Sequence, residues 1–410
     1  MRSSTIIHYL CRTAIVLILA GIISTLFVTV SFCIPEHRVS ENRERSEKIL
    51  KELEPGYKNW ELLFTHGWNG YIDTETDYLI IEHTRSDPDR PPLKNAMSHY
   101  PRYWEGGSAY LRIMFLVFSY AQVRYLLMAV ITLLICAVSL KTAERVGKGI
   151  SFAFVISLIA GNYILIPFTM QVSNCFVIAL SAMLWVLCRY RGRQTDFLKL
   201  YTGFMITGAV LAFFDLLTVP VLTIGMPLCV LILLNLLEYK ITDIKTNMKY
   251  IAGLSASWLI GYGGLWVQKW LIGSVVLGKN VFSDALNQVV YRTGNTHVEF
   301  NRFYTIALNL KAILPTQGEN LFRIMFFITV SVVAAVIILL MRRPDFSDLR
   351  MFLPLLLTGL YPIIWYLAVA DHSEVHASIL SWRLLMIPVF ILCSVYAYYF
   401  NKGKGVTRAK

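Results

Sequence analysis

The feature that most constrains this chain is a series of apolar windows that recurs along most of its length. An α-helix needs about 20 mainly apolar residues to cross the hydrocarbon core of a bilayer. About ten windows approach this length, at 12–33, 122–141, 149–167, 172–188, 200–214, 217–237, 250–271, 322–341, 350–369 and 383–400. The window at 200–214 is short, and we expect it to break at FDLLTVP or to re-enter the membrane there. The sequence therefore predicts an all-α polytopic membrane bundle.

Composition agrees with this fold class. The chain is 56% hydrophobic and only 16% charged, far more apolar than a soluble globular domain. The net charge of +12 fits basic inner loops better than nucleic-acid binding. The seven cysteines have neither paired nor zinc-like spacing, so we expect no disulfide framework and no zinc site. Glycine-rich nucleotide motifs are absent, and GYGG (261–264) within a span favours a close helix contact or a kink.

Lysine and arginine in the connections give an orientation, since short inner loops are enriched in both. With the N-terminus inside and the first span an uncleaved anchor, the basic connections all fall inside: 141–149, 189–199, 238–249, 341–350 and the tail 401–410. The remaining connections fall outside, at 34–121, 168–174, 214–220, 272–321 and 370–382. We therefore divide the chain into a first span with a large outer loop, 1–121, and a bundle, 122–410, whose second long outer loop is 272–321.

The first outer loop is predicted to be structured. Residues 36–60 are charged and have helical character, as expected of an amphipathic helix on a membrane surface. Residues 67–84 form an acidic turn followed by an apolar strip, and residues 87–107 are rich in turn formers and aromatics. Residues 108–120 form an apolar helix too short to span comfortably. Long structured loops in compact proteins are usually functional.

One span, then a large structured outer loop, then a bundle of further spans is an arrangement that resembles the GT-C type glycosyltransferases of bacterial cell envelopes. Four short segments of the sequence also resemble that family. The segments are TETDYLII (74–81), PLKNAMSHYPRYWEGG (92–107), FDLLTVP (214–220) and HSEVHASILSWR (372–383). The resemblance implies a multi-pass enzyme of the cytoplasmic (inner) membrane that moves a sugar from a polyprenyl-phosphate carrier to a glycan or lipid acceptor on the outer face. It implies membrane lipids but no nucleic acid as partners, and no certain cofactor, with a divalent cation left open.

Such a transfer needs a carboxylate to take the acceptor's proton. In GT-C type glycosyltransferases this carboxylate usually lies in the first outer loop. Asp77 is the preferred base, with Asp73 and Glu75 beside it, although an Asp at this turn could instead cap a helix. Glu36 is an alternative to Asp77, because the catalytic acid of these glycosyltransferases often follows the first span closely, as Glu36 does. Asp215 is a third hypothesis, as an acid at membrane depth, and its alternative role is again a helix cap.

The leaving lipid phosphate needs cations, and arginine binds phosphate through its planar fork. The outer candidates are Arg102, Arg292 and Arg383. His372 and His376 share a helical face, and Arg383 follows two turns later on nearly the same face. The histidine pair lacks an evident third metal ligand, so hydrogen bonding to the phosphate or sugar is the preferred role.

Aromatic side chains suit sugar rings, and Tyr103 and Trp104 are the candidates for stacking. They could equally belong to an interfacial aromatic belt.

Two other classes of protein remain open. A flippase or transporter of lipid-linked saccharides would also be polytopic, but the chain shows no clear internal repeat and its charges gather at the outer ends. A non-catalytic membrane protein that binds envelope sugars is not separated by sequence from an enzyme.

Overall fold

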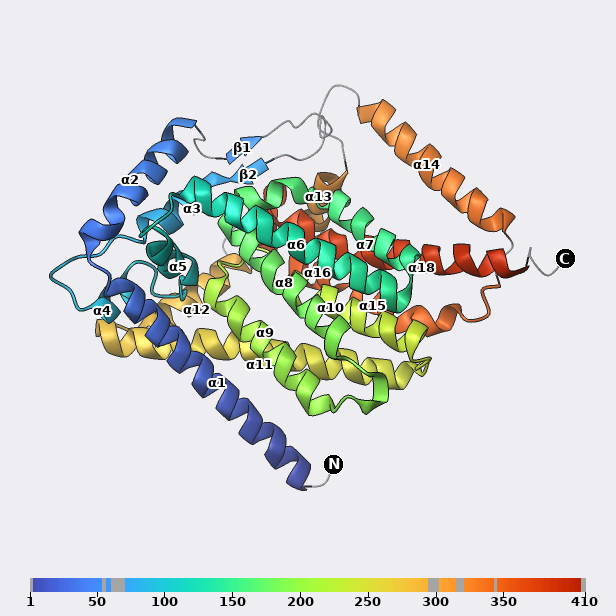
Figure 1. Cartoon of the computed structure of the whole chain (residues 1–410), viewed down its shortest axis with the longest axis horizontal. Helices are drawn as coiled ribbons and strands as arrows, with labels where there is room; N and C mark the ends of the chain where they lie inside the picture. Colours follow the sequence, from blue (N-terminus) through green and yellow to red (C-terminus); the bar gives the residue numbers. More distant parts are fainter. Residues whose placement is uncertain are drawn as a thin grey trace.

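The computed structural model describes residues 3–53, 57–59, 71–293, 302–314, 321–342 and 345–406. Helices dominate these residues (Figure 1). Their one sheet joins β1 (Tyr57–Asn59) and β2 (Tyr71–Asp73) in an antiparallel pair, with Lys58 opposite Ile72. The predicted all-α class is confirmed.

Most of the long helices belong to the apolar windows, and several shorter helices lie in the connections. In chain order the α-helices are α1 (Ser3–Phe32), α2 (Glu36–Leu53), α3 (Thr74–Glu82), α4 (Pro92–Ser98), α5 (Gly106–Met114), α6 (Tyr120–Val146), α7 (Lys148–Ala160), α8 (Met170–Arg189), α9 (Phe197–Phe214), α10 (Leu222–Leu233), α11 (Ile244–Leu277), α12 (Val281–Arg292), α13 (Arg302–Ile313), α14 (Leu321–Met341), α15 (Leu353–Thr358), α16 (Tyr361–Ala368), α17 (Ala370–Val375) and α18 (Met386–Val406). The short 3-10 helices are η1 (Tyr163–Phe168), η2 (Gly192–Gln194), η4 (Leu349–Phe352) and η5 (Ser381–Leu385), and η3 (Leu234–Glu238) is a π-helix.

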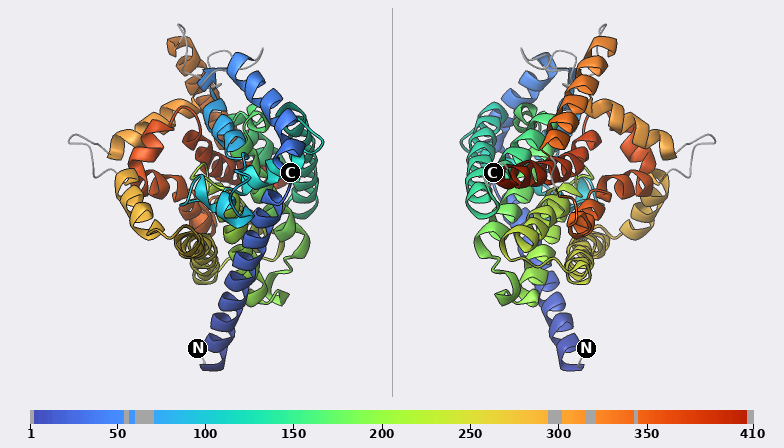
Figure 2. Two further views of the ribbon diagram at one scale, coloured as in Figure 1. Left: turned by 90° about the vertical axis from the view of Figure 1, so that its left-hand side faces the viewer. Right: turned by 90° about the vertical axis from the view of Figure 1, so that its right-hand side faces the viewer.

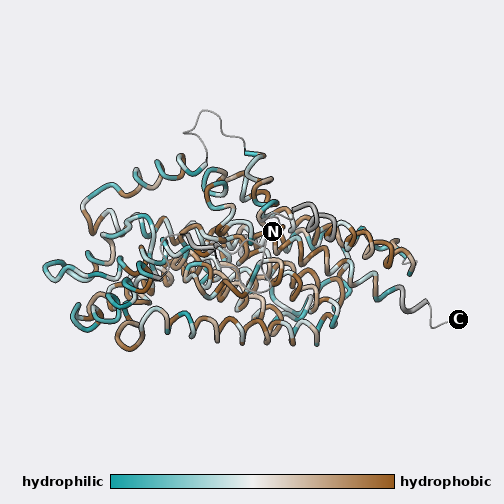
Figure 3. The backbone as a smooth tube through the Cα atoms, turned by 90° about the horizontal axis from the view of Figure 1, so that it is seen from above, coloured by the Kyte–Doolittle hydropathy of each residue, from teal (hydrophilic) through white to brown (hydrophobic). Residues whose placement is uncertain are grey.

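Within the described residues, six helical segments are long and apolar enough to cross a membrane: Ile6–Phe32, Tyr120–Val146, Met170–Arg189, Phe197–Phe214, Leu349–Ala368 and Ser381–Lys402. Three shorter apolar helices, Lys148–Ala160, Leu222–Glu238 and Ile328–Met341, and the 34-residue α11 cover the remaining predicted windows. Figure 3 colours the long helices mostly hydrophobic and the loops near the left-hand end mostly hydrophilic.

Proline accounts for one interruption that the sequence reading missed. The window 350–369 is divided into η4, α15 and α16, and Pro354 and Pro362 stand in the first turns of α15 and α16. Proline is favoured in the first turn of a helix because the missing N–H has no partner there in any case. The predicted break after 200–214 is present, because α9 ends at Phe214.

Glycine permits a close helix contact between α9 and α11. A Cβ on Gly208 would lie 2.1 Å from the carbonyl oxygen of Trp258, and a Cβ on Gly261 would lie 2.0 Å from that of Met205. The two backbones therefore touch through positions where only glycine fits. This confirms the close helix contact predicted for GYGG. In Figures 1 and 2, by contrast, α14 lies apart from most of the bundle and meets it at α18.

The connections assigned to the inner side meet one another. Arg145, from 141–149, donates to Glu238 at 2.8 Å and to the backbone oxygen of Tyr190 at 3.1 Å. Lys402, from the tail, lies 3.0 Å from Asp348. These contacts join all five basic connections into two groups.

The connection 34–121 contains the charged helix that was predicted, as α2, and a short apolar helix, α5, which ends at Met114 rather than at the predicted residue 120. Part of the predicted 36–60 segment lies outside the described residues. Arg112 of α5 is fully buried and ties the loop together. Its guanidinium donates to the backbone oxygens of Ser31 and Ile34 at 3.0 and 2.6 Å and to the carboxylate of Glu36 at 2.8 Å.

Candidate functional site

A cavity of about 110 Å³ gathers polar side chains from distant parts of the chain. It is lined by Asp73, Thr76, Leu79, Tyr100, Tyr103, Gln171, Leu216, Arg292, His372, His376 and Leu380. A smaller space of about 30 Å³ shares Tyr103 and Arg292 with it and adds Arg102, Trp266, Trp270 and Gln288 among its lining residues. Of the side chains predicted to bind substrate, Tyr103, Arg292, His372 and His376 line the larger cavity, and Arg102 lines the smaller one.

Each connection that charge assigned to the outer side contributes to this cavity. Asp73 comes from 34–121, Gln171 from 168–174, Leu216 from 214–220, Arg292 from 272–321 and His376 from 370–382. The segments are brought together because they all connect helix ends on one side of the bundle.

Asp73 is the only carboxylate among the described residues that line the cavity, and it is fully buried. One oxygen accepts from the backbone N–H of Thr76 at 2.9 Å, so Asp73 is the N-cap of α3. The other accepts from the Thr76 hydroxyl at 2.7 Å and from Gln171 Nε2 at 2.5 Å. Three donors therefore fix its orientation toward the cavity.

His372 holds Arg292, and both side chains line the cavity. Its Nε2 lies 2.7 Å from the backbone oxygen of Leu217, which can only accept, so Nε2 carries the proton. Nδ1 is then an acceptor, and the Arg292 guanidinium donates to it at 3.0 Å. Burial, followed by the charges of His376 and Arg292, lowers the pKa of His372 well below its usual value. The imidazole is therefore neutral near pH 7.

His376 presents an unused polar atom. Its Nδ1 is buried and has no hydrogen-bond partner among the described residues. The ring centroid lies 4.5 Å from that of His372. Burial is the main cause that lowers the pKa of His376; Asp73 and Asp371 oppose the shift and Arg292 adds to it. A buried nitrogen without a partner at a cavity wall is suited to a ligand.

An aromatic and cationic group forms the side of the cavity contributed by the α4–α5 segment. The rings of Tyr100 and Tyr103 lie 4.9 Å apart, and the Arg102 guanidinium lies 4.8 Å from the Tyr100 ring. Arg102 is neutralised by Asp284 of α12 at 2.8 Å. Burial raises the pKa of Tyr103 to about 12, so its hydroxyl stays protonated.

Trp104, predicted beside Tyr103, faces elsewhere. It is buried in the bundle, where its indole N–H donates to the backbone oxygen of Leu265 at 2.8 Å. It does not line the cavity, so a stacking role for Trp104 gains no support from its position.

Asp77 lies behind the cavity rather than in its wall. It is buried and accepts from the Tyr120 hydroxyl and, at 3.0 Å, from the backbone N–H of Met170, and Arg124 lies 3.7 Å away. Burial raises the pKa of Asp77 to about 7, against the charge of Arg124 and the hydrogen bond from Tyr120. This carboxyl group titrates near neutral pH but does not touch the space that a substrate would enter.

Glu36 is occupied by structure. Arg43 and Arg112 both pair with its carboxylate, and the backbone N–H of Ser86 donates to it at 3.1 Å. Burial alone would raise its pKa, but the two arginines outweigh burial and lower it. Glu36 therefore clamps α2 to α5, and it does not line the cavity.

Asp215 closes the end of α9. Its oxygens accept from the backbone N–H of Thr218 at 2.8 Å and from the Tyr262 hydroxyl at 2.7 Å. Burial raises its pKa. The neighbouring Leu217 adopts a left-handed φ of 68° and supplies the oxygen bound by His372. Asp215 thus stabilises the bend that positions His372. It is the C-cap of α9 and does not cap the next span, since α10 begins at Leu222 with Val221 as its N-cap.

The continuous helix expected from His372 to Arg383 is wrong. α17 ends at Val375, a turn follows, and η5 begins at Ser381. The guanidinium of Arg383 is buried, donates to the backbone oxygen of Ile379 and does not line the cavity. Helical periodicity fails because the chain turns between the two segments.

Gln171 and Thr76 are the cavity residues that sequence reasoning missed. The available signal was weak, a single amide in FTMQVSN and a threonine within TETD. Among the described residues no group of three or more His, Cys, Asp or Glu side chains could hold a metal ion. No protein-family model, curated protein or solved structure matches this chain.

Proposed function

We propose that this protein is a multi-pass glycosyltransferase of the bacterial cytoplasmic membrane. It moves a sugar from a polyprenyl-phosphate carrier to a cell-envelope acceptor on the outer face. The observation that carries the proposal is the cavity itself, where five connections with the same predicted sidedness bring a carboxylate together with an arginine and two histidines. Glycosyl transfer from a lipid phosphate needs a base and a cation that face each other across the sugar.

Arg292 is the proposed partner of the leaving phosphate. Its charge faces the cavity and is not neutralised by the imidazole that holds it, because that imidazole is neutral. His376 supplies a second polar contact through its free Nδ1. As the bond from the anomeric carbon to the phosphate oxygen breaks, these groups stabilise the charge that develops on that oxygen.

Asp73 is the proposed base, because it is the carboxylate that lines the cavity. It accepts the proton of the acceptor hydroxyl while that oxygen bonds to the sugar. Asp77, four residues later on α3, supports the same turn from behind. The cavity is smaller than the range of about 300–1,000 Å³ typical of ligand pockets. We therefore expect it to receive the reacting sugar edge and phosphate, with the lipid chain outside it.

The test uses the full-length protein in proteoliposomes with a radiolabelled polyprenyl-phosphate sugar and a range of acceptors. Release of polyprenyl phosphate and transfer of the label are measured. Asp73→Asn is expected to lower turnover by about 10²–10⁴-fold, the usual contribution of a general base. Arg292→Met should lower it strongly as well, and Glu75→Gln is the matched control, since Glu75 is exposed on the same turn.

Full activity of Asp73→Asn would overturn the choice of base. If the activity is lost in Asp77→Asn instead, the base acts from behind the cavity wall. Movement of the intact lipid-linked sugar across the bilayer without bond cleavage would identify a flippase, and binding with neither activity would identify a non-catalytic sugar-binding protein.

A further inference from the structure

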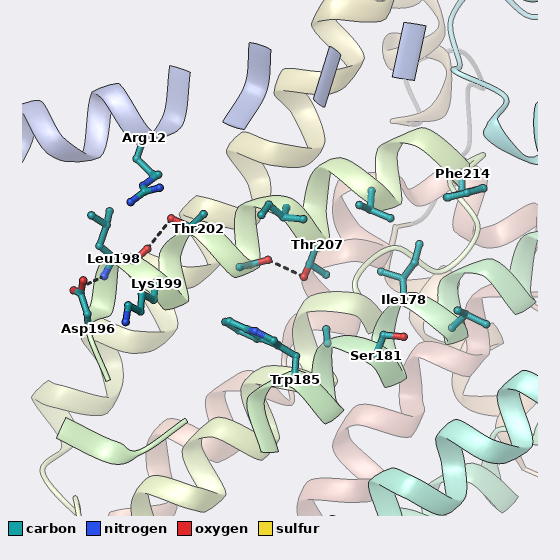
Figure 4. Close-up of a pocket in the computed structure, with 15 residues that line it drawn as sticks. Arg12, Ile178, Ser181, Trp185, Asp196, Leu198, Lys199, Thr202, Thr207 and Phe214 are labelled. Atoms are coloured by element: carbon teal, nitrogen blue, oxygen red, sulfur yellow. Dashed lines mark hydrogen bonds between the residues drawn. The ribbon is translucent and has the colours of Figure 1, made fainter. Parts of the chain in front are cut away.

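Two apolar grooves flank α9 at a distance from the cavity described above. The first holds about 670 Å³ between α8 and α9, within the range of ligand pockets, and Arg12 of α1 stands at one end of it (Figure 4). The second holds about 440 Å³ between α1 and α9. The two share Ile206, Val210 and Phe214, so a single ridge of α9 separates them.

Two of the hydroxyl groups that line the first groove are already hydrogen-bonded, and the other polar side chains along its middle are Ser181 and Trp185. The hydroxyls of Thr202 and Thr207 donate to backbone oxygens of the preceding turn of α9, those of Leu198 and Gly203, at 2.8 and 2.9 Å. Because these two hydroxyls are satisfied within their own helix, covering them with hydrocarbon costs little desolvation free energy.

One end of the groove is cationic. Figure 4 shows Arg12 and Lys199 at the same end, with Phe214 at the other. Neither cation has an ion pair in the described part of the chain. The carboxylate of Asp196 also lies there, where it caps α9 through the Leu198 N–H at 3.0 Å.

Further positive charge lies next to this end, on the link between α8 and α9. A separate depression of about 510 Å³ is lined by Arg191, Arg193 and Lys240 together with Gln194, Tyr239 and Ile241. Arg12 is held in place because α1 is fixed to α9 one residue away, where Thr13 Oγ1 lies 3.2 Å from the Tyr201 hydroxyl. The end of the grooves therefore attracts an anion.

We propose that these grooves bind one anionic diacyl glycerophospholipid, with its phosphate at Arg12 and Lys199 and one acyl chain in each groove. The ridge residues Ile206 and Val210 lie seven and eleven positions beyond Lys199, about 11 and 17 Å along the helix. Half of a bilayer's hydrocarbon core is about 15 Å thick, so the chains of one leaflet fit this length.

This phosphate site is distinct from the one in the proposed function. The cavity with Arg292 lies beyond the other end of α9, which at 18 residues is about 27 Å long. A phosphate held by Lys199 therefore cannot be the reacting phosphate, and an ordinary membrane phospholipid is the occupant that the geometry favours over a polyprenyl phosphate.

Native mass spectrometry of the purified protein tests the site, with phosphatidylglycerol and phosphatidylcholine of identical acyl chains added in turn. The wild type should bind phosphatidylglycerol at least ten-fold more tightly. The double variant Arg12→Gln/Lys199→Gln should lose this preference. The double variant Lys245→Gln/Lys249→Gln should keep it, because it removes the same charge from exposed positions of α11 outside the grooves.

A further variant, Val210→Trp, fills the ridge between the grooves without changing charge and should weaken binding of both lipids. The proposal is overturned if phosphatidylcholine binds as tightly as phosphatidylglycerol, or if the α11 control loses the preference equally. Tighter retention of polyprenyl phosphate than of phosphatidylglycerol would overturn the choice of occupant. The readout is independent of sugar transfer, so its failure leaves the proposed function untouched.

Discussion

The buried carboxyl group of Asp77 should make the stability of this protein depend on pH. Its pKa is about 7 in the folded protein and 3.8 when exposed, chiefly because of burial. Below pH 3.8 both states hold the proton. Between these values the unfolded chain ionises while the folded protein keeps its proton, so the free energy of unfolding falls as pH rises. Above pH 7 the free energy of unfolding is lower by about 4 kcal/mol than it is below pH 3.8.

Asp77→Asn removes this loss, because the amide never ionises. The substitution also disturbs the hydrogen bonds with Tyr120 and the Met170 N–H, a cost of about 1 kcal/mol for each weakened bond that does not vary with pH. The informative quantity is therefore the change with pH. Relative to the wild type, the variant should gain about 3 kcal/mol of stability between pH 5 and pH 8.

Thermal unfolding in detergent, followed by intrinsic tryptophan fluorescence from pH 5 to 8, measures this gain. The melting temperature of Asp77→Asn minus that of the wild type should rise by about 5 °C between pH 5 and pH 8. Glu75→Gln is the control, since it removes an exposed carboxylate from the same helix and should leave the pH profile unchanged. If the Asp77→Asn profile runs parallel to that of the wild type, the carboxyl group is not protonated in the folded protein and our reasoning fails.

Three further predictions concern packing and the cavity. Arg112→Met should destabilise the protein by about 3–5 kcal/mol, because it leaves a carboxylate and several backbone oxygens without their buried partner, and a melting shift in detergent measures this. Gly261→Ala should cost about 1–3 kcal/mol by forcing α9 and α11 apart, whereas Gly263→Ala, where a Cβ meets nothing within 4 Å, should be neutral or slightly stabilising in the same assay. His372→Ala should lower kcat more than it raises KM for the lipid-linked donor, because Arg292, which is proposed to stabilise the charge that develops on the leaving phosphate, loses the acceptor that positions it; an unchanged kcat would count against that role.

The fold class was predictable because it follows from a local property of the chain. A run of apolar residues of membrane length has one stable backbone conformation in a bilayer, so the helices could be placed from windows alone. The basic connections then predicted which loops share a side. That grouping agrees with the cavity, where Asp73, Gln171 and Leu216 meet Arg292 and His376.

The individual acids were less predictable, because a carboxylate's role depends on the groups that face it. Asp73, Glu75 and Asp77 are near neighbours in the sequence. Only the structure separates them, because Asp73 lines the cavity, Glu75 is exposed and Asp77 is buried without lining the cavity. Glu36 followed the first span as a catalytic acid would, yet two arginines occupy it. Asp73, Asp77 and Glu36 differ in their hydrogen-bond partners, which lie up to 98 positions away along the chain.

The sequence by itself determined that the chain forms apolar helices and that its ionisable connections divide into two sets. It could do so because hydropathy and charge act on each segment separately, through the solvent that surrounds it. Only the tertiary structure decided which side chains of one set share a cavity and which are used to hold helices together. That choice depends on how α3, α12 and α17 pack and where the chain bends between them, as it does between His376 and Arg383. Such contacts join residues that are far apart in the chain, and helical periodicity predicts only which nearby residues share a face.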